Sequence, residues 1–201
     1  MHMGTYPEIL RRIQPAMKPL FSALGSGIEL ANRLHGTEGF DRSDDAHYWA
    51  HTVRRRTCEM LKTDGLQADL ETEFTNLSAI LVQYNGVWLR VLRPEIRKGS
   101  KELVPLPGRS KPRQAFYRQD PVLDDLEGVA SDNILAIWRD KDGKLREPLK
   151  LVRPLGGDHE RRNLRLDWEG ELRSDMASLR AADLDALQPT ATYPQLGSDT
   201  A

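Results

Sequence analysis

The chain has 201 residues, a net charge of −1 and a single cysteine, Cys58. One cysteine excludes an internal disulfide framework and a zinc site built on thiolates. It also fits a reducing compartment, so we expect a cytoplasmic protein. No apolar run approaches the ~20 residues that a membrane-spanning helix needs, which argues against a membrane partner. The length predicts a single domain, which we place at residues 4–187.

The N-terminal third of the chain, residues 6–64, is predicted to be helical. Between Ile9 and Leu34, apolar residues recur at three- and four-residue steps, as an amphipathic helix requires. Pro15 and Pro19 would each cost a helix interior about 3 kcal/mol. We therefore expect the first helix to break and restart near Pro15.

A second helix is expected to begin after Ser43, which can serve as its N-cap, and to end at Lys62. One face of this helix is an apolar stripe, which should cover the sheet. His47 and His51 lie one turn apart on its flank, a spacing that can chelate a metal. Tyr48 stands where a zinc protease would carry glutamate, so we interpret the two histidines as surface residues.

The sheet part, residues 68–168, is dominated by two predicted β-hairpins. Asn85-Gly86 is a preferred pair for a two-residue type I′ turn, because both positions must tolerate positive φ. A second hairpin should span residues 133–154, and shorter strands are expected at 68–74 and 164–168. The first turn predicts three facing pairs on one apolar face: Ile80–Val91, Val82–Leu89 and Tyr84–Val87.

The C-terminal part is expected to form one helix over residues 174–187, capped by Ser174, followed by a disordered tail at 188–201. The fold class is thus α+β. We expect N-terminal helices packed on an antiparallel, or mixed, sheet of two hairpins, with a C-terminal helix.

Positive charge is concentrated in the middle of the chain. Nine Lys and Arg but only two acids lie between Asn85 and Gln119, so the rest of the chain is acidic. Within this segment, residues 95–120 are predicted to be a long loop, with a short strand at 115–117. Loops of this length inside a domain are usually functional or disordered. Four cations and two rings there form the candidate anion-binding or nucleic-acid-binding site: Arg109, Lys111, Arg113, Phe116, Tyr117 and Arg118.

The chemistry of these residue types suits a nucleic acid. Lys and Arg neutralise phosphates, and adjacent aromatic rings can stack on exposed bases. The cations could equally engage an acidic protein surface, or pair with the acidic remainder of the same chain. The partner is therefore expected to be a nucleic acid or an acidic protein surface.

Two alternatives stay open. Glu71 and Glu73 share one strand face, and Asp167 and Glu169 share another. If the two strands were neighbours, the four carboxylates could hold a divalent metal and support a small hydrolase or nuclease. The second alternative is a protein–protein interaction module that uses an exposed face around Trp88 and Leu92.

Nothing else in the sequence indicates catalysis. The Gly-x-Ser-x-Gly elbow, the phosphate-binding Gly-rich loop and the dinucleotide fingerprint are all missing. We therefore predict no catalytic residues, no resident metal and no cofactor. The favoured hypothesis is a non-catalytic binding or regulatory protein that engages an anionic partner, preferably a nucleic acid, through its basic loop.

Overall fold

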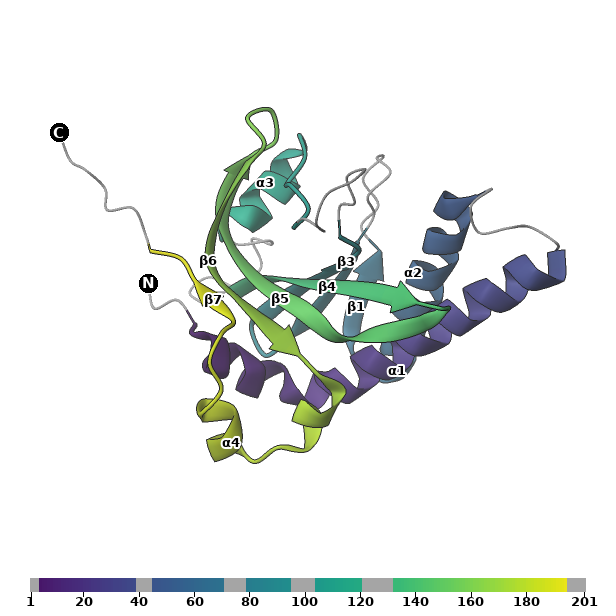
Figure 1. Cartoon of the computed structure of the whole chain (residues 1–201), viewed down its shortest axis with the longest axis horizontal. Coiled ribbons are helices and arrows are strands. Elements are labelled where there is room, and N and C mark those ends of the chain that lie inside the picture. Colours follow the sequence, from purple (N-terminus) through teal and green to yellow (C-terminus); the bar gives the residue numbers. More distant parts are fainter. Residues whose placement is uncertain (1–3, 39–44, 71–78, 95–103, 121–131, 195–201) are drawn as a thin grey trace.

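The computed structural model describes residues 4–38, 45–70, 79–94, 104–120 and 132–194. Within them, helices flank one mixed, mostly antiparallel sheet of seven strands in sequential order, which confirms the α+β class. In Figure 1 the longest helix runs beneath this sheet. The described elements are α1 (Tyr6–Glu38), α2 (Ala46–Thr63), β1 (Gln67–Leu70), β2 (Ile80–Tyr84), β3 (Val87–Leu92), α3 (Lys111–Tyr117), β4 (Asp132–Lys141), β5 (Lys144–Asp158), β6 (Asn163–Leu172), the 3₁₀ helix η1 (Ser174–Ser178), α4 (Ala181–Asp185) and β7 (Ala191–Thr192).

The two hairpins form where the sequence predicts them. β2 and β3 are antiparallel, with the three predicted pairs Ile80–Val91, Val82–Leu89 and Tyr84–Val87 in register. The turn residues Asn85 and Gly86 have φ of 46° and 68°, as a type I′ turn requires. β4 and β5 form the second hairpin, while β3 and β4 are parallel. The sheet is therefore mixed at its centre.

The predicted helix break at Pro15 is wrong, because α1 continues through both prolines. Pro15 is exposed and Pro19 is half-buried, whereas the opposite side of the helix is almost completely buried against the sheet. Burial of a long apolar stripe outweighs the local cost of two missing hydrogen bonds. This stripe includes Ile9, Leu10, Ile13, Met17, Leu20, Leu24 and Ile28.

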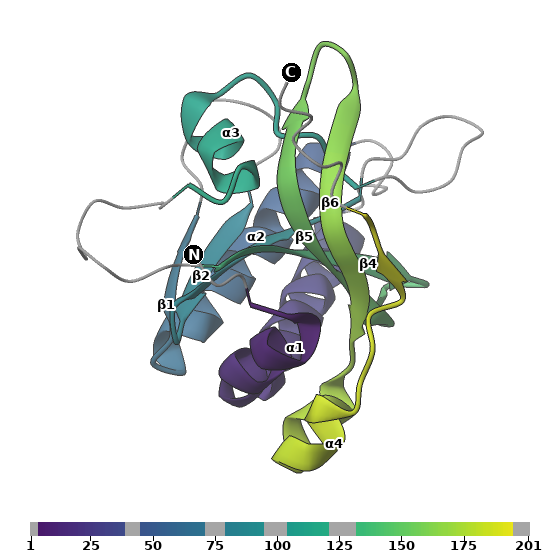
Figure 2. The same cartoon turned by 90° about the vertical axis from the view of Figure 1, so that its left-hand side faces the viewer.

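α2 packs against the second half of α1 (Figures 1 and 2). The close approach occurs at Gly27, where an added Cβ would lie 2.7 Å from both the Val53 carbonyl oxygen and the Thr57 hydroxyl. Asp45, rather than Ser43, caps α2, since its carboxylate accepts a hydrogen bond of 2.8 Å from the Tyr48 amide. Ser43 lies outside the described residues.

The sheet is covered on both faces. The α1 face carries the large apolar core, which includes Val87, Leu89 and Val91 of β3. On the other face, α3 and the segment before it cover a smaller cluster that contains Trp88 and Leu92, 8% and 7% exposed. The alternative of an exposed Trp88/Leu92 docking face is therefore wrong. The cover is supplied by the segment that the sequence predicts to be an open loop.

The C-terminal part differs from its prediction. Instead of one helix over 174–187, the chain forms the short helices η1 and α4. Ser174 does not cap a helix, because its hydroxyl and its amide donate to the Glu147 carboxylate at 2.8 Å. Within the expected tail, Ala191 and Thr192 form β7 and pair with the open edge of β6. Residues 195–201 lie outside the described residues.

Candidate anion-binding surface

The predicted basic loop contains a helix. The short strand expected at 115–117 is wrong, since α3 spans Lys111–Tyr117. Ser110 is the N-cap and accepts a hydrogen bond of 3.4 Å from the Arg113 amide, while Pro112 occupies the first turn. Both residue types are favoured at these positions. These local signals, and not the β-propensity of Phe116-Tyr117, decide the conformation.

Three of the predicted site residues lie on the buried face of α3. Arg113, Phe116 and Tyr117 are 4%, 3% and 0% exposed, and they recur at the three- and four-residue spacing of one helix face. The Tyr117 hydroxyl donates a hydrogen bond of 2.6 Å to the Pro105 carbonyl oxygen. The two rings anchor α3 on the sheet, so in this conformation they are not available to stack on a base.

The other three predicted cations are on the surface. Arg109, Lys111 and Arg118 are exposed at the two ends of α3. Arg118 forms an ion pair of 2.9 Å with Asp120 two residues later. The predicted set is thus divided, with buried residues holding the helix in place and exposed residues facing solvent.

The structure adds a second group of cations, from the turn between β5 and β6. In Figure 2 this hairpin extends beyond the rest of the molecule, with α3 beside it. Arg109 lies 3.9 Å from Glu160 in the turn. The Arg118 and Arg165 side chains both lie next to Gly156 on β5, where an added Cβ would be 3.7 Å and 3.1 Å from them. The end of the β5–β6 hairpin and α3 therefore form one continuous surface.

We call this region the basic surface. It carries six exposed cations against three described carboxylates, Asp120, Asp158 and Glu160, so a positive excess remains after local pairing. Sequence reasoning missed the half contributed by the turn, although the run His159-Glu160-Arg161-Arg162 was visible. The six cations are Arg109, Lys111, Arg118, Arg161, Arg162 and Arg165.

The proposed carboxylate metal site is not assembled in the described residues. β1, which leads towards Glu71 and Glu73, is separated from β6 by four strands, so the strands are not neighbours. Glu71 and Glu73 themselves lie outside the described residues. In the part of the chain that the structure describes, no group of three or more His, Cys, Asp or Glu side chains could hold a metal.

The other two carboxylates do not share a face either. The pairs Pro154–Leu166 and Arg153–Trp168 place a β-bulge at Asp167. Asp167 lies 3.6 Å from Arg153, whereas Glu169 forms an ion pair of 2.5 Å with Lys150. Lys150 and Arg153 are an odd number of residues apart on β5, so their side chains lie on opposite faces of the sheet. The bulge breaks the simple alternation on which the prediction relied.

A buried charge cluster that the sequence analysis did not identify lies on the α1 face. Asp132 accepts from Arg153 at 2.6 Å and from Arg12 at 2.5 Å, and its carboxylate also accepts from the Gly4 amide at 3.2 Å. Arg153, 1% exposed, also donates to the Gly4 carbonyl oxygen. The cluster therefore ties the start of the chain to β4 and β5.

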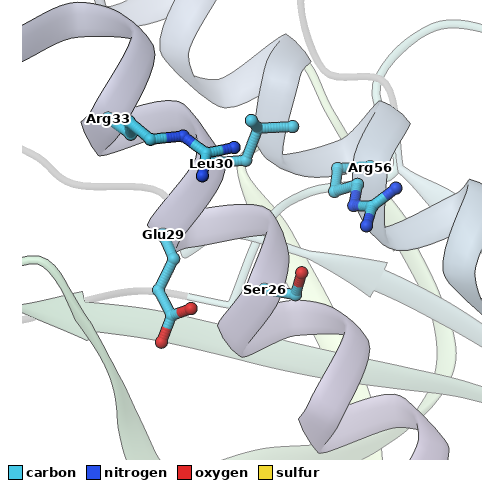
Figure 3. Close-up of a pocket in the computed structure, with 5 residues that line it drawn as sticks. All are labelled: Ser26, Glu29, Leu30, Arg33 and Arg56. Atoms are coloured by element: carbon cyan, nitrogen blue, oxygen red, sulfur yellow. The ribbon is translucent and has the colours of Figure 1, made fainter.

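A cavity of about 490 Å³ lies between α1 and α2. It is lined by Ser26, Glu29, Leu30, Arg33 and Arg56. In Figure 3 the Glu29 carboxylate points away from both arginines, so the polar groups do not converge on one point. His47 and His51, on α2, are exposed, as expected for surface residues. This cavity is a weaker candidate than the basic surface.

Comparison with known proteins supplies no functional precedent. No family model matches the chain, and neither curated proteins nor solved structures contain a significant match. None of the described helices is long and apolar enough to cross a bilayer. The function is therefore argued from the side chains themselves.

Proposed function

We propose that the protein is a non-catalytic binding protein whose basic surface engages the phosphate backbone of a nucleic acid. The observation that carries the proposal is the convergence of two separate sequence segments, α3 and the β5–β6 turn, on one cationic surface. Cations brought together in this way can neutralise several successive phosphates and release their counterions. An isolated basic loop would lack that extended footprint.

The burial of Phe116 and Tyr117 refines the expected mode of binding. Base stacking contributes ~1–3 kcal/mol per base to single-strand binding, and these rings are covered. The exposed groups of the basic surface are cations, which contact phosphates irrespective of sequence. We therefore expect no preference for single strands over duplex and little dependence on base sequence.

The test is a titration of labelled single-stranded and double-stranded oligonucleotides, followed by fluorescence anisotropy at two salt concentrations. Replacing Arg109, Lys111 and Arg118 by alanine should weaken binding about tenfold or more and shallow the salt slope by roughly two to three units. A second triple variant, at Arg161, Arg162 and Arg165, should behave alike, because both groups belong to the same surface.

The matched control replaces Lys18, Arg33 and Arg55 by alanine. These cations are exposed on α1 and α2, on the other side of the sheet, and the net charge changes by the same amount. An equal loss of oligonucleotide affinity in the control would show that binding depends on the total charge of the protein and not on the basic surface. Wild-type binding that is undetectable at ~50 mM salt would exclude nucleic acid. Tight binding of polyglutamate instead would identify an acidic protein partner.

A further inference from the structure

The end of the β5–β6 hairpin is a projecting, two-stranded ribbon. In Figures 1 and 2 its turn projects from the sheet, beside α3. The segment before α3 packs against the hairpin at Gly157, where an added Cβ would lie 3.4 Å from Pro107. Beyond that position residues 159–163 are all exposed, and the Arg161 side chain is 83% exposed. The tip of the hairpin is therefore accessible to a large ligand.

Hydrogen bonds within the turn fix its shape. One carboxylate oxygen of Asp158 accepts from the amides of Glu160 and Arg161 at 2.8 Å and 3.1 Å. The Asp158 amide donates to the Asn163 side-chain oxygen at 2.9 Å, which closes the turn. Arg162 has a φ of 51°, in the left-handed region. The two adjacent arginines are thus carried on an ordered turn, so a ligand meets a preorganised tip.

The exposed end of the hairpin carries more positive than negative charge. Residues 158–165 contain two acids and three arginines, Arg161, Arg162 and Arg165. One acid, Glu160, lies 3.9 Å from Arg109, which precedes α3. The other, Asp158, accepts the two backbone amides and lies 3.7 Å from Arg161. An anionic ligand would therefore meet guanidinium groups at the tip and along one strand of the ribbon.

The dimensions of a β-ribbon favour one kind of nucleic acid. Paired strands lie about 4.8 Å apart, and the major groove of B-form DNA, about 12 Å wide and about 8.5 Å deep, admits a two-stranded ribbon. The minor groove, about 6 Å wide, is too narrow. The major groove of an A-form RNA duplex is deep and narrow, so side chains cannot enter it. A projecting ribbon can therefore distinguish the two duplexes by groove width.

We propose that the partner is duplex DNA and that the tip of the β5–β6 hairpin enters its major groove. In this arrangement Arg161 and Arg162 lie in the groove, while Arg109 and Lys111 contact the phosphates beside it. The inference rests on the function proposed above and names the class of nucleic acid. Groove width supplies the preference, so it is compatible with little dependence on base sequence.

The first test compares labelled duplex DNA with duplex RNA of the same sequence by fluorescence anisotropy at low salt. The wild-type chain should bind the DNA duplex at least about fivefold more tightly, because only DNA has a major groove wide enough for the ribbon. Phosphate contacts alone are available on both duplexes. A preference for DNA therefore has to be assigned to one part of the basic surface, which requires two matched variants.

The tip variant combines Arg161→Ala with Arg162→Asn, since asparagine tolerates the left-handed backbone at residue 162. It should reduce the ratio of DNA affinity to RNA affinity to about one. The control variant, Arg109→Ala with Lys111→Ala, removes the same charge from exposed residues next to the hairpin. It should weaken binding of both duplexes by the same factor and leave the ratio unchanged. Thermal melts verify that both variants are folded.

A second measurement identifies the groove. Bulky groups attached at C5 of the pyrimidines occupy the major groove and leave the minor groove and the phosphates unchanged. Such a DNA duplex should bind the wild type about as weakly as the RNA duplex does. The tip variant should bind the substituted and the plain DNA duplex equally, because it no longer places guanidinium groups in the groove.

The outcomes separate this inference from the proposed function. Failure of the wild type to bind either duplex overturns both. Equal wild-type affinity for the two duplexes, a DNA preference that survives in the tip variant, or binding that is insensitive to the C5 groups overturns only the placement of the hairpin in the major groove. In those cases binding through phosphates alone would still hold.

Discussion

The two faces of the sheet differ in the helix that covers them and in what is buried there. The α1 face has a continuous apolar core beneath a 33-residue helix. The α3 face is covered by a seven-residue helix, and its buried layer includes Arg90 and Arg113 beside the aromatic rings. A helix of seven residues is not stable alone, so α3 depends on its buried anchors. We infer that the first face maintains the fold and the second presents cations to solvent.

The largest expected loss comes from the buried charge cluster of the α1 face. Asp132→Ala would leave Arg153 buried without its closest ion-pair partner, which should cost about 3–5 kcal/mol of unfolding free energy. Asp69→Ala is the control, because Asp69 forms an exposed ion pair of 2.7 Å with Lys62. Its loss should cost less than about 1 kcal/mol of unfolding free energy. Urea denaturation measures both, and comparable losses would show that Arg153 is not isolated from water.

Truncating one buried leucine on each face compares how much the two faces contribute to stability. Leu89 on β3 faces α1, and Leu135 on β4 faces α3; they are 1% and 0% exposed. Leu89→Ala should cost about 2–5 kcal/mol, and Leu135→Ala should fall near the lower end of that range, since the thin α3 layer can relax into the cavity. A larger loss at Leu135 than at Leu89 would contradict the division of roles between the two faces.

A smaller effect is expected at Tyr6, which fastens α1 to β6. Its hydroxyl donates a hydrogen bond of 2.5 Å to the Glu171 carbonyl oxygen, so Tyr6→Phe should cost about 1 kcal/mol at neutral pH. Burial raises the pKa of Tyr6 above its usual value of 10.0. The wild type should therefore lose stability as the pH rises above about 10, because its unfolded state ionises first.

The Tyr6→Phe variant lacks that ionisation, so the stability difference between it and the wild type should shrink at alkaline pH. Thermal melts between pH 8 and pH 11 test this. A constant or widening difference over that range would mean that the hydroxyl ionises equally well in the folded protein.

The smallest effect is expected on the exposed side of α3. Arg109→Ala should change the unfolding free energy by less than about 0.5 kcal/mol, because its contact with Glu160 spans 3.9 Å and both side chains are exposed. Tyr117→Phe, beneath the same helix, should cost about 1 kcal/mol through its lost bond to Pro105. A substantial loss for Arg109→Ala would assign it a structural rather than a ligand-facing role.

Features that depend on local backbone chemistry were predictable from the sequence. Asn85-Gly86 selects a type I′ turn, and this turn sets the register of every pair in the first hairpin. The α+β class and the position of α2 also follow from periodicity over short windows. α3 was predictable in principle, since Ser110, Pro112 and the spacing of its buried residues all favour a helix.

Other features were decided by contacts between distant segments. The continuity of α1 through Pro15 depends on the sheet beneath it, and the face on which Asp167 lies depends on a bulge in its pairing with β5. The sequence identified Arg109, Lys111 and Arg118 as candidate cations. Only the tertiary structure placed Arg109 and Arg118 next to the β5–β6 hairpin and buried Phe116 and Tyr117, because proximity and burial arise from packing between segments that no local pattern specifies.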